Sequence, residues 1–335
     1  MGDLTRAQEQ VLIAVLEIYR RTRGKKAPDQ ELLNSSANSI FEDELLDWAG
    51  VPEQLQANGF LEEKAGRYFL TESGLTRAQE LYRDFFSRNF DSLLVQCAQS
   101  PTYSIFCERV YGRDLCQFNS AGMDQLDELL EVLGLHESDR VLDLGCGAGK
   151  ISEYIADTTG AHVTAVDYAP GAIELARKRT ESKRDRLTFE LGDLDRLEQI
   201  PGPFDAVVAV DVLYFAVFVD RTLSQLKRLI EPHGQMGALF SQIIPPGGSR
   251  DRLLPGNTVL AGELSQQGLS FVTRDISDRD LDFWQRTLDT ARDLREAFEA
   301  EGNLEIFESR HDEAQQMVEV VRDDRTRSYI YHVRL

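Results

Sequence analysis

The stretch that decides the fold of this 335-residue chain is VLDLGCGAGKI, residues 141–151. An apolar run typical of a buried strand is followed by Gly145, Gly147 and Gly149, and a helical pattern begins directly after them. Glycines let a backbone turn approach a ligand closely, and the N-terminus of the following helix offers free amide groups. The stretch therefore predicts a nucleotide-like ligand at the end of the first strand of an α/β sheet.

The same stretch argues against a dinucleotide-binding dehydrogenase. The fingerprint of that class is GxGxxG, because its third glycine packs the helix closely on the strand. This turn is GxGxG, and Lys150 stands where the fingerprint has its third glycine. A pyrophosphate-binding dehydrogenase is accordingly disfavoured.

Strand-like and helical patterns alternate from Arg140 to Gln242. The predicted strands are 141–144, 162–166, 187–191, 205–210 and 235–240. Regular alternation of this kind implies a parallel sheet covered by helices on both faces. A strand at 269–273, a long acidic helical region that ends near Asp324 and a final strand at 328–335 are expected to complete the sheet.

Three further motifs follow the glycine-rich turn. Asp167 ends the second strand, 24 residues after Asp143; Gly192-Asp193-Leu194 follows the third strand; and FDAVVAVDVLY, residues 204–214, forms the fourth strand and its end. With this set, about residues 120–242 resemble the class I S-adenosylmethionine-dependent methyltransferases, whose first motif is an acidic residue followed by GxGxG. The resemblance implies a Rossmann-like, seven-stranded methyltransferase sheet with helices on both faces, and S-adenosyl-L-methionine as the cofactor.

The resemblance also implies which residues contact the cofactor and the acceptor. In the family, an acidic side chain at the position of Asp167 accepts both ribose hydroxyls, and a carboxylate at the position of Asp193 lies beside the adenine amino group. The implied cofactor contacts are Asp143, Gly145, Cys146, Gly147, Gly149, Asp167, Tyr168, Asp193, Leu194 and Val210. The implied acceptor pocket has the aromatic candidates Tyr103, Tyr111, Tyr214, Phe215 and Trp284. Packing in the core is the alternative role of each aromatic.

No catalytic residue follows from the sequence. Methyl transfer is an in-line displacement at a carbon that the sulfonium already activates, so the enzyme can act by positioning and desolvating the reactants. Plant-type small-molecule O-methyltransferases use a histidine downstream of the fourth strand, but Tyr214 to Arg228 contains none, and His311 or a carboxylate remain alternatives. The four cysteines include no CxxC pair, so no metal site is predicted and reduced thiols are expected.

Residues 1–86 are predicted to form a separate domain. Three helical patterns, the second around residues 42–48, precede a short hairpin and a closing helix, an order that resembles a winged-helix domain. A DNA-binding domain of this kind should carry basic residues on its third helix, yet Val51 to Phe60 contains none. Residues 1–95 hold 11 basic and 16 acidic side chains, so packing or homodimerisation is the favoured role.

Residues 87–135 are predicted to form a helical connector, and residues 136–335 the methyltransferase domain. The connector is expected at the carboxyl ends of the strands, where open α/β sheets bind ligands. Its aromatics and the segment Ser120-Ala121-Gly122 would let it close as a lid over the cofactor and exclude water from the acceptor. The alternative is that these aromatics only fix the first domain to the sheet.

The charge balance argues against nucleic acid as a partner. Lys and Arg number 37 against 57 Asp and Glu, and the formal charge of −20 repels phosphate backbones. Residues 275–324 hold 16 acidic and 6 basic side chains, which form a solvated helix face or a field that attracts a cationic substrate.

No apolar stretch approaches ~20 residues and the N-terminus lacks a signal-peptide pattern, so a cytoplasmic protein without membrane contact is expected.

The leading hypothesis is a cytoplasmic methyltransferase that modifies a small molecule at N, O or C. Two alternatives remain open. One is a regulator whose winged helix binds DNA while its methyltransferase fold senses the cofactor; the domain order favours it and the acidic third helix opposes it. The other is a protein methyltransferase, although the aromatic-rich connector fits a small acceptor better than a peptide groove.

Overall fold

The computed structural model describes residues 4–22, 27–41 and 46–334. The chain divides into two compact units, Met1–Asn89 and Phe90–Leu335. The sequence places the end of the first domain at residue 86, close to this division. Helix α4 (Glu72–Gln99) begins in the first unit and ends in the second.

The first unit differs from the sequence prediction at its second helix. Its elements before α4 are α1 (Arg6–Thr22), α2 (Gln30–Phe41), α3 (Val51–Ala57) and the antiparallel pair β1 (Leu61–Lys64) and β2 (Arg67–Leu70). The predicted helix at 42–48 is wrong for residues 46–48, which are not helical; residues 42–45 lie outside the described residues. The helix comes earlier because Asp29 accepts a hydrogen bond from the Leu32 amide (2.9 Å) and Leu33 is buried. The winged-helix resemblance stays a prediction.

The second unit is built on a seven-stranded sheet in the order β5-β4-β3-β6-β7-β9-β8. Its strands are β3 (Arg140–Leu144), β4 (His162–Asp167), β5 (Leu187–Leu191), β6 (Phe204–Val210), β7 (Ile230–Ile243), β8 (Ser270–Asp275) and β9 (Thr326–Arg334). Strands β3 to β7 run parallel, and β9 lies antiparallel between β7 and β8. The predicted Rossmann-like α/β fold is confirmed.

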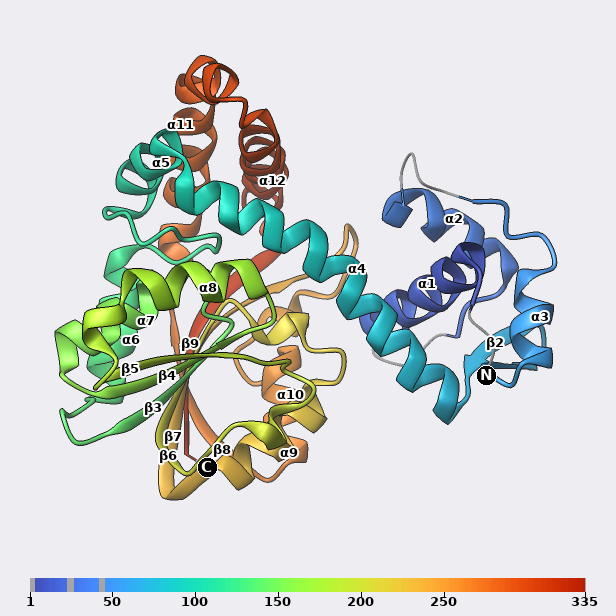
Figure 1. Ribbon diagram of the computed structural model, residues 1–335, viewed down its shortest axis with the longest axis horizontal. Coiled ribbons are helices and arrows are strands. Elements are labelled where there is room, and N and C mark those ends of the chain that lie inside the picture. The colour runs from blue at the N-terminus through green and yellow to red at the C-terminus, as the bar shows by residue number, and fades with distance from the viewer. Residues whose placement is uncertain (1–3, 23–26, 42–45, 335) are drawn as a thin grey trace. The chain divides into compact units, whose positions relative to one another are not determined.

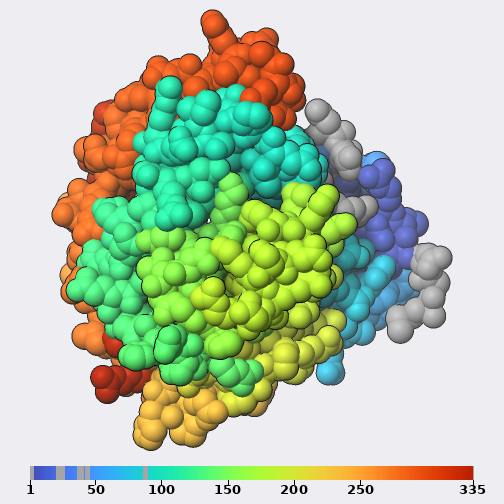
Figure 2. Space-filling view, turned by 60° about the vertical axis from the view of Figure 1, so that its left-hand side comes forward, coloured from blue at the N-terminus to red at the C-terminus, as the bar shows by residue number. Residues whose placement is uncertain are grey.

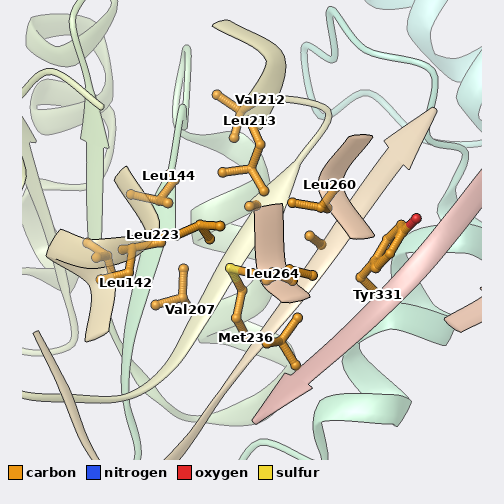
Figure 3. Packing of buried hydrophobic residues seen from close by; sticks show 14 of the residues in the cluster. Leu142, Leu144, Val207, Val212, Leu213, Leu223, Met236, Leu260, Leu264 and Tyr331 are labelled. Atoms are coloured by element: carbon orange, nitrogen blue, oxygen red, sulfur yellow. The ribbon is translucent and has the colours of Figure 1, made fainter. Parts of the chain in front are cut away.

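Helices cover both faces of this sheet (Figure 1). One face is covered by α6 (Met123–Leu133), α7 (Lys150–Thr159) and α8 (Pro170–Arg179), and the other by α9 (Val219–Leu229) and α10 (Val259–Gln266). On the face covered by α9 and α10, Leu223 of α9 and Leu264 of α10 pack with Val207 and Met236 of the sheet (Figure 3). Strands buried on both sides read as continuous apolar runs, which is why the sequence reveals β3 and β6.

Three further helices and the end of α4 form a substructure that we call the cap. The helices are α5 (Pro101–Tyr111), α11 (Asp280–Glu301) and α12 (Leu304–Arg322). The cap has an aromatic core, in which the ring centroids of Phe106 and Phe298 are 6.4 Å apart and those of Tyr111 and Phe283 are 5.6 Å apart. Figure 2 shows the teal connector between the orange C-terminal helices and the green residues of the sheet unit. The connector and the acidic C-terminal region thus fold together.

We predict that Phe298→Ala destabilises the second unit by about 3–5 kcal/mol, because the ring is fully buried and its removal leaves a cavity in the cap. Urea and thermal unfolding measure the loss. Val272→Ala on β8 is the control, since this side chain is 69% exposed and its truncation should change the unfolding free energy by less than about 0.5 kcal/mol. Equal losses in the two variants would contradict a packed cap core.

Candidate cofactor and acceptor site

The glycine-rich turn between β3 and α7 is held against the end of β4 by backbone hydrogen bonds. The amides of Gly145 and Cys146 both donate to the Val166 carbonyl, at 2.8 and 3.1 Å. Gly145 has a φ of 69°, and a Cβ on it would lie 2.2 Å from Cγ2 of Val212. Backbone conformation and the side chain that follows β6 both exclude any larger residue here.

Asp167, the last residue of β4, holds the middle of the turn. Its Oδ2 accepts a hydrogen bond from the Gly147 amide at 2.8 Å, and its Oδ1 accepts one from the Ala169 amide at 2.9 Å. Burial raises the pKa of Asp167, while these amide donors lower it. The Tyr168 amide is a third donor to this carboxylate. A carboxylate has about four acceptor positions, so one remains for a ligand.

A pocket lies at the carboxyl ends of the central strands. It contains about 790 Å³ of empty space, including the part that is open to solvent. Its walls are formed by Phe90, Leu94, Leu115, Cys116, Gln117, Phe118, Asn119, Gly145, Cys146, Gly147, Ala148, Ile151, Val166, Asp167, Tyr168, Gly192, Leu194, Val210, Asp211, Val212 and Phe215. Gly147 has a φ of 51°, and a Cβ on it would point toward the Leu94 side chain at 3.9 Å. The bare glycine therefore keeps this part of the pocket open.

Seven of the predicted cofactor residues line this pocket: Gly145, Cys146, Gly147, Asp167, Tyr168, Leu194 and Val210. Asp143, Gly149 and Asp193 are described by the structure but are not part of its lining. A Cβ on Gly149 would lie 2.3 Å from the Phe189 ring, so this glycine lets α7 pack on the sheet. Asp193 accepts a hydrogen bond from the Asp195 amide at 2.9 Å, in the turn after β5. Cofactor contact stays a prediction for all of them.

Asp143 has a structural partner. It is only 2% exposed, and its Oδ2 accepts a hydrogen bond from the Ser152 hydroxyl of α7 at 2.6 Å. Burial raises the pKa of Asp143 to about 7; the Ser152 hydrogen bond opposes this rise and the charge of Asp167 adds to it. The carboxylate therefore ties α7 to β3 behind the turn.

We predict that Asp143→Asn raises the melting temperature at pH 8 and has little effect at pH 4. The unfolded pKa is about 4, so folding takes up a proton between about pH 4 and 7, and stability falls as the pH rises through this range. Asparagine has no charge and removes a penalty of at most about 4 kcal/mol. Melting curves measure the difference, with exposed Asp185→Asn as the control. The assignment fails if the difference does not depend on pH.

Phe215 is a predicted acceptor residue that lies at the pocket, and Tyr214 is its neighbour outside the lining. The ring centroid of Tyr214 is 5.0 Å from that of Phe215. Trp284 instead packs edge-on against Phe283 in the cap, with ring centroids 5.1 Å apart. Acceptor contact stays a prediction for these three aromatics.

Tyr103 and Tyr111 are buried in the cap and support the pocket wall from behind. The Tyr103 hydroxyl donates to the Gln117 carbonyl at 2.5 Å, and the Tyr111 hydroxyl donates to the Asn119 carbonyl at 3.0 Å. Gln117 and Asn119 both line the pocket. These tyrosines therefore position the loop between α5 and α6, while their predicted contact with an acceptor stays untested.

Sequence reasoning missed Asp211, which lines the pocket directly after β6. Asp211 has a φ of 51°, and its Oδ2 accepts hydrogen bonds from both the amide (2.7 Å) and the hydroxyl of Ser120. The available signal was an acidic residue directly after the apolar run of the fourth strand. In the described part of the chain, no group of three or more His, Cys, Asp or Glu side chains could hold a metal ion.

The role of Phe118 was also missed. Phe118 lines the pocket, and Arg310 of α12 lies over its ring, with the guanidinium carbon 4.5 Å from the ring centroid. Arg310 is 1% exposed and pairs with Glu313 at 2.6 Å. A buried arginine so distant in sequence from its aromatic partner leaves no pattern that sequence reasoning could find.

The end of α4 forms another wall of the pocket. Asp91 accepts hydrogen bonds from the amides of Gly171 (3.1 Å) and Ala172 (3.0 Å) at the N-terminus of α8. A carboxylate is favourable there because the helix dipole and the unpaired amides attract negative charge. Phe90 stacks on Tyr168 with ring centroids 6.3 Å apart. The connector thus contributes side chains to the pocket, and its closure as a lid stays a prediction.

The region that carries this site matches a known family. Residues 141–234, from β3 into β7, match the family described as a methyltransferase domain. The chain contains a class I S-adenosylmethionine-dependent methyltransferase domain. S-adenosylmethionine is the cofactor of this domain.

Relatives share this domain over part of their length. Methyltransferase GfsG of Streptomyces halstedii is 30% identical over 118 residues, which are 35% of this chain and 42% of that protein. A ubiquinone biosynthesis O-methyltransferase of Methylocella silvestris is 37% identical over 102 residues, 30% of this chain and 40% of that protein. The chain thus spans about two fifths of the length of these relatives. Phosphoethanolamine N-methyltransferase 2 of Haemonchus contortus, solved with S-adenosylmethionine, shares the fold: TM-score 0.59, 19% identity, 75% of this chain and 59% of that chain.

The pocket of the methyltransferase domain fits this cofactor. Gly147 leaves a cradle that a Cβ would fill, and Asp167 keeps one acceptor position for a ribose hydroxyl. Among the described residues that line the pocket there are two carboxylates and no Lys, Arg or His. A positively charged sulfonium therefore meets no like charge from the pocket wall.

We predict that Tyr111→Phe weakens S-adenosylmethionine binding, because it releases the Asn119 carbonyl and lets the pocket wall move. The lost hydrogen bond should also lower stability by about 1 kcal/mol. Tyr329→Phe is the matched control, since Tyr329 is 2% exposed like Tyr111, donates a hydrogen bond to the Leu253 carbonyl (2.6 Å) and lies outside the pocket lining. Calorimetric titration should show normal affinity for the control; equal weakening in both would exclude a specific role of Tyr111.

Proposed function

We propose that this protein is an enzyme that transfers the methyl group of S-adenosylmethionine to a small-molecule acceptor. The pocket carries the proposal, because it extends from Asp167 at the end of β4 to Asp211 after β6. The connector residues Leu115 to Asn119 form a further wall, so a ligand at the strand ends would be enclosed on several sides. Enclosure of this kind desolvates both reactants and aligns them for displacement.

The residues of this chain would fix the orientation of the cofactor. Asp167 would accept the ribose hydroxyls, and Tyr168 and Leu194, after β4 and β5, would flank the adenine. The glycine-rich turn would then hold the methionine portion, so that the reactive end faces the end of β6 and the cap. The cofactor supplies a methyl carbon activated by a sulfonium. The protein binds and orients it, and keeps water away from the acceptor.

A small acceptor is favoured over a protein by the walls of the pocket. Phe118 and Phe215 give it an apolar, aromatic surface, and the ring of Phe118 is backed by Arg310 and the cap. The ubiquinone biosynthesis O-methyltransferase acts, by its name, in the synthesis of a small molecule. A folded protein could present only a single side chain to a pocket walled in this way.

The role of the first unit, a homodimer through it and a cytoplasmic location stay predictions. The regulator hypothesis rests on the succession of three helices, a hairpin and α4 in that unit. It is opposed by α3, whose residues Val51–Ala57 include Glu53 and no basic side chain. Within the described residues, no helix has both the length and the apolar character needed to span a membrane.

We predict that the protein binds S-adenosylmethionine and that Asp167→Ala weakens binding by roughly 1.5 to 3 kcal/mol, the range for a hydrogen bond to a charged group. Calorimetric titration measures the affinity. Asp167→Asn is the informative companion variant, because its amide oxygen can still accept the Gly147 hydrogen bond while it lacks the charge and half of the acceptor capacity. Asp185→Ala, at an exposed turn, should bind as the wild type does.

Two results would overturn this assignment. Absence of binding to the wild type at near-millimolar ligand would remove the proposed function itself. Normal affinity of both Asp167 variants would leave the function standing and exclude Asp167 as the residue that holds the ribose.

A further inference from the structure

Asp211 is held in an unusual way at the end of β6. Its φ of 51° is in the left-handed region, which costs free energy for a residue with a side chain. The side chain is 6% exposed but contributes to the pocket wall. Ser120 donates to one carboxylate oxygen through its amide and its hydroxyl, and the Tyr214 hydroxyl also donates to the carboxylate. Three donors therefore fix this carboxylate in one orientation.

Few other side chains of the pocket lining could accept a proton from a bound ligand. The lining residues that the structure describes include two carboxylates and no histidine or lysine. Asp167 is bound by three backbone amides beside the glycine-rich turn, on the side of β4. Because the sheet order is β5-β4-β3-β6, Asp211 lies at the opposite side of the pocket, next to the aromatic pair Tyr214 and Phe215. His311, an alternative from the sequence, pairs with Asp312 on α12 and is not part of the lining.

We propose that Asp211 is the catalytic base of the methyl transfer and that the acceptor is an aromatic compound with an acidic hydroxyl group, a phenol or an enol. The inference rests on the proposed function. In the step, the acceptor oxygen forms a bond to the methyl carbon while its proton passes to the Asp211 carboxylate. The carbon–sulfur bond breaks, and its electron pair stays on the sulfur. Asp211 then releases the proton to solvent.

The surroundings of Asp211 strengthen it as a base. Burial raises its pKa, the hydrogen bonds from Ser120 and Tyr214 lower it, and the negative charge of Glu313 on α12 raises it further. Asp280 on α11 is a second acidic neighbour that interacts with Asp211. A carboxylate is still a far weaker base than an alkoxide, so it can assist a phenol, with a pKa of about 10, much better than an aliphatic alcohol. This restricts the acceptor to acidic hydroxyls.

The aromatic side chains beside Asp211 favour an acceptor whose hydroxyl is attached to an aromatic ring. Phe215 is 50% exposed and Tyr214 is 37% exposed, and the Tyr214 hydroxyl makes a hydrogen bond to Asp211. The Tyr214 ring also lies against Phe240 of β7, with centroids 5.9 Å apart. Exposed aromatic side chains beside a buried polar group are suited to hold a planar apolar ligand by stacking and to leave its polar group at the carboxylate.

The test uses 4-nitrophenol, whose colour reports its ionisation, bound to the full-length protein saturated with S-adenosylhomocysteine. Next to the Asp211 carboxylate the phenol should keep its proton, so its apparent pKa in the complex should lie above that of free 4-nitrophenol. Asp211→Asn removes the charge and should lower this apparent pKa by at least one unit, with S-adenosylhomocysteine affinity unchanged within about threefold. Tyr214→Phe removes a donor to Asp211, makes the carboxylate more basic and should move the value in the opposite direction.

Different results would contradict the methyltransferase function and the role of Asp211. Failure of the wild type to bind S-adenosylmethionine contradicts the proposed function. Normal cofactor binding without any binding of 4-nitrophenol, or the same apparent pKa in the wild type and Asp211→Asn, overturns the role of Asp211. If Asp211→Asn does not fold, Tyr214→Phe decides: a rise supports the proposal, and no change or a fall contradicts it.

Discussion

The end of strand β4 is the feature on which the site depends. The Val166 carbonyl accepts two amides of the glycine-rich turn, and the Asp167 carboxylate accepts a third, from Gly147. Together they hold two glycines at positive φ, with Gly145 packed against Val212 and Gly147 open to the pocket. The same carboxylate thus shapes the turn and offers its remaining acceptor position to a ligand. This dual use stabilises a buried charge, because the amides supply the hydrogen bonds that burial would otherwise remove.

The loop between α5 and α6 is positioned by polar side chains instead of secondary structure. Tyr103 and Tyr111 hold its carbonyl groups from the cap, and Lys150 binds Asp114 at 2.7 Å from the start of α7. Lys150 stands where a dinucleotide fingerprint has glycine, and here it ties the loop to the helix after the turn. The two parts of the pocket are therefore mechanically connected. Loops of this kind can carry binding residues because a rigid frame holds them.

Local pattern explains which parts of the molecule were predictable. The strands that surround Gly145 and Asp167 are buried on both faces, so their apolar runs are unambiguous, and glycine spacing marks the turn between them. Helix α2 was misplaced because its polar residues give no clear helical pattern. Its stability comes from buried Leu33 and from the hydrogen bond that Asp29 accepts at its N-terminus. The contact of Asp211 with Ser120 joins residues 91 positions apart, and no sequence period encodes such a pair.

The charges around the pocket favour the transfer of a methyl group from a sulfonium. Basic groups near the pocket have acidic partners, Lys150 with Asp114 and Arg310 with Glu313, whereas the lining itself contributes the carboxylates. Opposite charges attract more strongly in an enclosed site than in water. Transfer of a methyl cation equivalent to a hydroxyl, with the proton taken up by Asp211, neutralises a sulfonium and a carboxylate in the same step. A reaction that removes two opposite charges is favoured by the exclusion of water, so a cap that encloses the strand ends would promote the chemistry as well as the binding.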